Sequence, residues 1–347
     1  MSDLEAARIE AEAQRLFESL GQTTDFKTGL KRSAEYCRSI APLTLKINDL
    51  KREKDAVILA HYYCTPDIVY GIADFKGDSY ALAKKAAQAE QKNIIFCGVY
   101  FMAQTAKIIS PDKNVFLPPV TAGCSLADGI DAEEAAKLKA KYPEAALVCY
   151  INSTAEVKAF CDVCVTSSNV YDIVCALPNK QIVFVPDLFM AENIRAELKR
   201  RGVEKEIISF GSTCCVHDKY TVRDIEEIKF AHPKAKIISH PECPRPVCEL
   251  SDYCGSTSGM LSYVKESGAE EFAVLSEDGI VNSLELENPS KTFYPVSGTC
   301  AQMKRNTLNN VWGVLENLDK SPRVEVNRDV ALKAKRCIDN MFKMAGK

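Results

Sequence analysis

The sequence predicts an α/β protein made of three similar three-layer αβα sandwich domains with short parallel sheets. Three observations support this prediction. A pattern recurs with a period of about 88 residues, short apolar runs alternate with helix-like stretches, and reactive polar residues follow the apolar runs. Self-similarity at a fixed period indicates repeated structural units. Alternation of apolar runs with helices is typical of parallel sheets that are covered on both faces.

The repeat is clearest where the apolar runs end. Three runs share a short apolar stretch followed by reactive side chains: AVILAHYY (56–63), ALVCYINST (146–154) and AKIISHPEC (235–243). His61, Tyr150 and His240 stand at their ends, 89 and 90 positions apart. Ligands of parallel sheets gather at the carboxyl ends of the strands. We therefore expect the three units to surround one central cavity about a pseudo-threefold axis.

A second repeated pattern ends in cysteine. Cys124, Cys214 and Cys300 close the stretches VFLPPVTAGC, IISFGSTC and TFYPVSGTC, with spacings of 90 and 86. Units arranged about one axis would bring these thiols together. A cluster held by three cysteines keeps one iron open, and that iron can act as a Lewis acid. Spacing alone leaves two interpretations open, metal ligands and buried core cysteines.

The period also divides the chain. We expect an N-terminal helical extension followed by three repeats and two C-terminal helices that pack on the first repeat. The corresponding ranges are 1–40, 41–124, 125–214, 215–300 and 301–347.

Composition narrows the class of protein. Apolar residues make up 46% and charged residues 26% of the 347 residues, which is typical of soluble globular proteins. The net charge of −3 gives no reason to expect nucleic acid or a membrane surface as partner. The N-terminus is charged throughout, and the sequence contains no apolar run of about 18 residues. We expect a cytoplasmic protein.

Fifteen cysteines are many for this length. Without an export signal they are expected as reduced thiols, which serve as small core residues, ligands or nucleophiles. Cys161 and Cys164 form a close C-x-x-C pair, but the sequence offers no second pair for a zinc site. We expect these two in the core.

Polar residues near the run ends suggest acid–base chemistry. Tyr63 lies two positions after His61, and Glu242 two positions after His240, a spacing that puts both members on one face of an extended segment. Each pair is a plausible acid–base pair. His217 lies three positions after Cys214 and is a further candidate.

Serine and threonine residues precede the helix-like stretches. Helix N-termini attract phosphate and carboxylate groups, although structural capping explains each residue singly. Three such starts facing one cavity would suit a substrate with several negative groups. The residues are Ser79, Ser167, Ser256 and Thr257.

Together these motifs resemble the quinolinate synthases over roughly residues 45 to 310. The motifs occur in the order and spacing of that family, and their combination is specific. They are AHYY, GDS, AGCSLAD, YINSTAEVKA, TSSN, CCVHD, HPEC, GSTSGM and CAQMKRNTL. The loop PDLFMAENI departs from the family's usual pattern, and Cys64 stands where a glutamine is common.

The resemblance implies a transferase of NAD biosynthesis that condenses iminoaspartate with dihydroxyacetone phosphate to quinolinate, losing phosphate and water. It implies a [4Fe–4S] cluster on Cys124, Cys214 and Cys300, and an enzyme partner that supplies iminoaspartate. It assigns proton transfer to His61, Tyr63, His217, His240 and Glu242. Substrate binding falls to His61, Ser79, Tyr150, Asn152, Ser167, His240, Glu242, Ser256 and Thr257.

Two rival interpretations remain at this point. One is another hydro-lyase with a three-cysteine cluster. The other is a non-enzymatic iron–sulfur sensor, against which the net acidity and the lack of a recognition-helix signature count.

Overall fold

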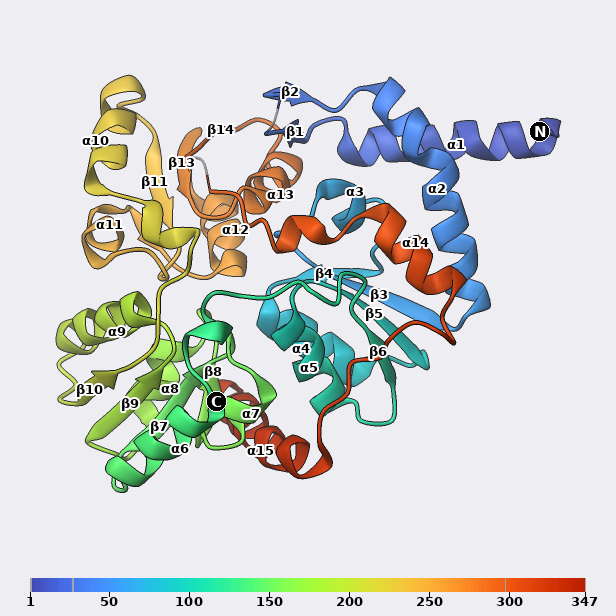
Figure 1. The fold of residues 1–347 in the computed structure, drawn as a ribbon. Coiled ribbons are helices and arrows are strands. Elements are labelled where there is room, and N and C mark those ends of the chain that lie inside the picture. The colour runs from blue at the N-terminus through green and yellow to red at the C-terminus, as the bar shows by residue number, and fades with distance from the viewer. Residues whose placement is uncertain (1, 27, 297, 347) are drawn as a thin grey trace.

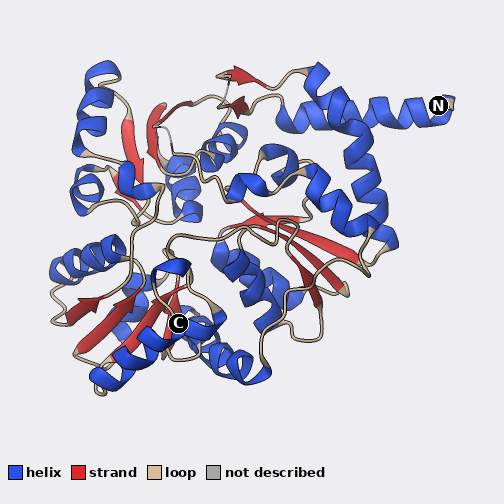
Figure 2. Cartoon of the chain, viewed as in Figure 1, coloured by secondary structure: helices blue, strands red, loops and turns tan. Residues whose placement is uncertain are grey.

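Three separate four-stranded parallel sheets, each flanked by helices, form the body of the protein (Figures 1 and 2). The structure is a computed structural model and describes residues 2–26, 28–296 and 298–346. Within those ranges no helix is both long and apolar enough to cross a membrane.

The three units contain the same succession of elements. The first has α2 (Ala34–Glu53), β3 (Ala56–His61), α3 (Pro66–Val69), β4 (Phe75–Gly77), α4 (Ser79–Gln88), β5 (Asn93–Cys97), α5 (Tyr100–Ile109), β6 (Asn114–Phe116) and the 3-10 turn η1 (Ala127–Gly129). The second has α6 (Ala132–Lys141), β7 (Ala146–Tyr150), α7 (Ala155–Lys158), β8 (Val163–Val165), α8 (Val170–Ala176), β9 (Gln181–Val185), α9 (Leu188–Arg200), β10 (Glu206–Ser209) and η2 (His217–Lys219). The third has α10 (Val222–Ala231), β11 (Lys236–Ser239), α11 (Arg245–Leu250), β12 (Tyr253–Cys254), α12 (Thr257–Glu266), β13 (Glu271–Leu275), α13 (Gly279–Glu287), β14 (Thr292–Pro295) and η3 (Met303–Arg305).

The sheets also share one strand order. They run β4-β3-β5-β6, β8-β7-β9-β10 and β12-β11-β13-β14, so the first strand of each unit lies between the second and the third. Every residue of β3, β5, β7 and β8 is buried, as expected for parallel sheets covered on both faces. The predicted α/β class is therefore confirmed, whereas the pseudo-threefold axis stays a prediction.

Local sequence explains where corresponding helices begin. Asp131 and Glu134 form a capping box at the start of α6, and Thr221 and Asp224 form one at the start of α10. Each box satisfies two backbone N–H groups that the first helical turn leaves without partners.

The N-terminal residues form a helix and a small hairpin outside the first unit. Helix α1 (Asp3–Leu20) buries Leu16 and Leu20 against α2. The hairpin consists of β1 (Thr24–Asp25) and β2 (Leu30–Lys31).

The two C-terminal helices divide between units. Helix α14 (Leu308–Glu316) packs on α2, but α15 (Arg328–Ala345) lies mainly against β8 and α7 of the second unit (Figure 1). The expectation that both helices pack on the first repeat is therefore wrong for α15. The linker passes β6, where Val324 donates its N–H to the carbonyl of Val115 at 2.8 Å, and so carries the chain across.

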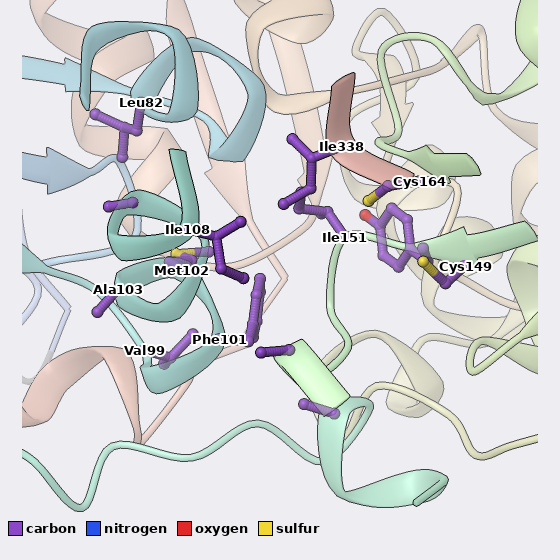
Figure 3. Packing of buried hydrophobic residues seen from close by; sticks show 14 of the residues in the cluster. Leu82, Val99, Phe101, Met102, Ala103, Ile108, Cys149, Ile151, Cys164 and Ile338 are labelled. Atoms are coloured by element: carbon purple, nitrogen blue, oxygen red, sulfur yellow. The ribbon is translucent and has the colours of Figure 1, made fainter. Parts of the chain in front are cut away.

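Helix α15 helps to join the first two units in one core. Ile338 stands between Ile108 of the first unit and Cys164 of the second (Figure 3). Cys337 faces Cys149 of β7, with the two sulfurs 3.6 Å apart. The third unit has hydrophobic clusters of its own.

Candidate active site

The three predicted ligand cysteines occupy equivalent turns. Each follows the last strand of its sheet and precedes a 3-10 turn, η1, η2 or η3. In each, the residue four positions on donates its backbone N–H to the cysteine carbonyl, at 2.9 to 3.1 Å. Each sulfur also accepts backbone N–H groups from the residues two and three positions on. The repeat thus places three sulfurs in matching backbone cradles.

All three turns open on one cavity. Its lining includes nearly every residue that the sequence analysis selected: His61, Tyr63, Ser79, Cys124, Tyr150, Asn152, Ser167, Cys214, His217, His240, Glu242, Thr257 and Cys300. Ser256 is the exception. It is the N-cap of α12, and its hydroxyl accepts the N–H of Gly259 at 3.0 Å.

The carboxyl ends of the strands bring these side chains together. His61 is the last residue of β3, Tyr150 is the last of β7, and His240 follows β11 directly. Two helices begin at the same cavity, α4 at Ser79 and α12 at Thr257. Backbone N–H groups and the positive end of the helix dipole make such starts suited to anions.

One backbone turn occurs twice in the site. The N–H of Tyr63 donates to Nδ1 of His61 at 3.1 Å, and the N–H of Glu242 donates to Nδ1 of His240 at 3.4 Å. Accepting at Nδ1 leaves the proton of a neutral imidazole on Nε2. Burial lowers the pKa of His61 to about 4 and that of His240 to about 3, so both rings are neutral near pH 7.

Glu242 lies at the centre of a buried polar network. The hydroxyl of Tyr150 donates to its Oε1 at 2.7 Å, and Nδ1 of His217 lies 3.0 Å from its Oε2. Burial alone would raise the pKa of Glu242, but His240, His217 and the Tyr150 hydroxyl hold that pKa below its usual value. The carboxylate therefore stays ionised although it is almost fully buried.

Tyr63 has the opposite protonation. Its hydroxyl lies 3.2 Å from the hydroxyls of both Thr257 and Ser276. Burial, and next the charge of Glu242, raise the pKa of Tyr63 well above its usual value. Near pH 7 the site thus contains a protonated phenol and an ionised carboxylate.

His217 connects this network to a cysteine. Its Nδ1 lies 3.2 Å from Sγ of Cys214, and its ring stacks on that of His240 with centroids 4.8 Å apart. Cys214, His217 and Glu242 each offer one ligand atom, and these atoms lie within 4.8 Å of one another. Geometry permits a metal ion here.

The thiols themselves fit a cationic group. Burial raises the pKa of Cys124 to about 12 and that of Cys300 to about 11, and it raises the pKa of Cys214 well above its usual value. The backbone N–H groups at each sulfur would donate hydrogen bonds to a thiolate and so lower the pKa, but burial raises the pKa by more. A positively charged metal centre would supply the missing stabilisation of three thiolates.

Several residues of the cavity were not among those predicted from the sequence. Asp78, Glu277 and Gln302 also line it, and Ser276 contacts both Tyr63 and His217. A signal for Glu277 existed, because it comes two positions after a buried strand, as Tyr63 does after β3.

Comparison with known proteins identifies the family of this chain. The family described as "Quinolinate synthetase A protein" matches residues 45–343. The quinolinate synthase of Clostridioides difficile strain 630 is 41% identical over 305 residues, which cover 87% of this chain and 98% of the relative. That of Caldicellulosiruptor bescii is 43% identical over 308 residues, covering 88% and 99%. That of Caulobacter vibrioides strain NA1000 is 38% identical over 306 residues, covering 87% and 82%. Similarity of this degree along most of the sequence shows that the chain belongs to the quinolinate synthetase A family.

Proposed function

We propose that the chain is a quinolinate synthase, an enzyme of NAD biosynthesis that condenses iminoaspartate with dihydroxyacetone phosphate and releases phosphate and water. The observation that carries this proposal is the single cavity where three equivalent cysteine turns meet the carboxyl ends of three sheets. Family membership supports the same reaction. The domain division 41–124, 125–214 and 215–300 is part of the proposal, with each unit supplying one cysteine.

The proposed cofactor is a [4Fe–4S] cluster held by Cys124, Cys214 and Cys300. The matched N–H donors at each sulfur favour thiolate ligands of a cluster at these three positions. When bound, such a cluster supplies a Lewis-acidic iron that helps a hydroxyl leave.

The cavity offers separate places for the anionic groups of the substrates. The N-termini of α4 and α12, with Ser79 and Thr257, would bind phosphate or carboxylate, together with Ser167 on the loop before α8. Tyr150 and Asn152 would contact the dicarboxylate part. Ser256 would contribute by capping α12.

Protonation states suggest how protons move. Glu242 is ionised and would accept a proton from carbon or nitrogen during enolisation and ring closure. Tyr63 is protonated and would donate one. His61 and His240, neutral with a proton on Nε2, would donate hydrogen bonds to developing oxyanions. His217 would orient Glu242 beside Cys214.

We further propose a cytosolic location and small-molecule substrates only. All fifteen cysteines are free thiols in the structure, which suits a reducing compartment. Because imines hydrolyse in water, an enzyme that produces iminoaspartate would be the functional partner.

The test is anaerobic purification with analysis of iron, sulfide and zinc, followed by assay of quinolinate from the two substrates. We expect about four irons per chain and turnover. Cys124→Ser, Cys214→Ser and Cys300→Ser should each lose the cluster, whereas the buried control Cys97→Ser should keep it. Zinc without sulfide, bound at Cys214, His217 and Glu242, would contradict the cluster. A full cluster without quinolinate would favour another hydro-lyase or a sensor.

A further inference from the structure

Glu277 is a fully buried carboxylate beside the Cys300 turn. Its side chain is 0% exposed, and it lies two residues after β13 at the cavity wall. Oε1 accepts the backbone N–H of Cys300 at 3.0 Å, and Oε2 accepts that of Gly279 at 2.7 Å. The carboxylate therefore holds the backbone of a predicted cluster ligand directly.

Lys304 provides the charge that balances this carboxylate. Its Nζ lies 2.7 Å from Oε1 of Glu277 and donates to the carbonyl of Tyr63 at 2.7 Å. The N–H of Lys304 also donates to the carbonyl of Cys300, at 3.1 Å. Hydrogen bonds and the ion pair thus join Cys300, Glu277 and Lys304 in a ring. The bond from Lys304 to Tyr63 links this ring in the third unit to the first unit.

The path is specific to one of the three cysteine turns. The position four residues after the cysteine is Asp128 in the first turn and Asp218 in the second, but Lys304 in the third. Asp187 follows β9 much as Glu277 follows β13, yet its Oδ1 accepts the N–H of Met190 and caps α9. The third turn therefore carries a lysine where the other two carry an aspartate, and this lysine contacts Tyr63.

We propose that Glu277 and Lys304 are positioning residues that fix the Cys300 ligand and the Tyr63 acid relative to each other. This inference rests on the proposed function, since it assumes that Cys300 binds the cluster and that Tyr63 moves a proton. Neither residue needs to touch substrate to act. Glu277 is fully buried and the Lys304 side chain is 24% exposed, so loss of the lysine would leave the charge of the carboxylate uncompensated in the interior.

The test compares Glu277→Gln and Lys304→Met with the conservative Lys304→Arg and with Glu266→Gln, which removes an exposed charge from α12. Supporting hydrogen bonds around a metal ligand are typically worth about 10- to 100-fold in metal affinity or activity. We expect Glu277→Gln and Lys304→Met to lose iron to a chelator about tenfold faster, with kcat lowered about tenfold and KM little changed. Lys304→Arg should restore both quantities, and Glu266→Gln should match the wild type.

A second readout needs no cluster. In the apoprotein, Glu277→Gln should make Cys300 react with an alkylating reagent several-fold faster than in the wild type, with Cys124 unchanged as internal control. Unchanged alkylation of Cys300, or wild-type iron retention and kcat in both Glu277→Gln and Lys304→Met, would overturn the inference. A wild type that binds no iron overturns the proposed function instead, and the alkylation rates still decide whether the pair holds the turn.

Discussion

Replacing Tyr150 with phenylalanine would remove one hydroxyl from the network around Glu242. The hydroxyl donates to Oε1 at 2.7 Å, and both residues are at least 95% buried. A hydrogen bond to a charged group contributes about 1.5–3 kcal/mol. Because the aromatic ring is kept, the main effect of losing this hydrogen bond is that the Glu242 carboxylate is held less firmly in position. If the bond is needed in the transition state, kcat falls about 10- to 150-fold.

The assay is steady-state formation of quinolinate by anaerobic protein of known iron content. Tyr294→Phe is the control, because its hydroxyl also donates to a carboxylate, that of Glu271 at 3.1 Å, but neither residue lines the cavity. The control should retain wild-type kcat. Activity of Tyr150→Phe within twofold of wild type, with a full cluster, would refute the role given to this hydrogen bond.

Three further predictions concern charge and packing. Glu242→Gln should keep the cluster and lose turnover, and near-normal activity would remove Glu242 from the mechanism. The folded-state pKa of His61, about 4, lies below its unfolded value of about 6.5, so the unfolded chain binds the extra proton and stability falls as pH drops below that value. Urea unfolding of the apoprotein should therefore show wild type losing about 2 kcal/mol more than His61→Gln between about pH 7.5 and pH 5, and equal losses would contradict the buried neutral ring. Ile338→Ala, at a fully buried site of α15, should lower the free energy of unfolding by about 2–5 kcal/mol, and a change under about 1 kcal/mol would mean that α15 adds little to the shared core.

The repeat in the sequence accounts for much of the site. Cys124, Cys214 and Cys300 could be selected because each closes the same pattern, and the structure places them in the same turn. His61, Tyr150 and His240 could be placed because apolar runs predict strands, and strands of a parallel sheet end at one edge. A repeat in the sequence shows which local structures recur, so it predicts the site residues that occupy equivalent positions in the three units.

The repeat in the sequence does not predict contacts between the units. Lys304 meets Tyr63 across 241 positions of sequence, and that contact depends on how the third unit faces the first. The apolar face of α15 would suit any exposed sheet face, so its burial was predictable but its place on β8 was not. Cys149 and Cys337 likewise meet only because of that placement.

The two copies of the His-x-acid turn show how repeated structure could acquire divided chemistry. In both, the residue after next donates its N–H to Nδ1 of the histidine, so the backbone makes no distinction between Tyr63 and Glu242. The two side chains and their surroundings do distinguish Tyr63 from Glu242. Burial and the charge of Glu242 raise the pKa of the Tyr63 phenol, so Tyr63 keeps its proton, whereas His240, His217 and the Tyr150 hydroxyl hold the pKa of Glu242 below its usual value. An acid and a base thus arise from one turn placed in two units, because the turn carries a phenol in the first unit and a carboxylic acid, whose ordinary pKa is much lower, in the third.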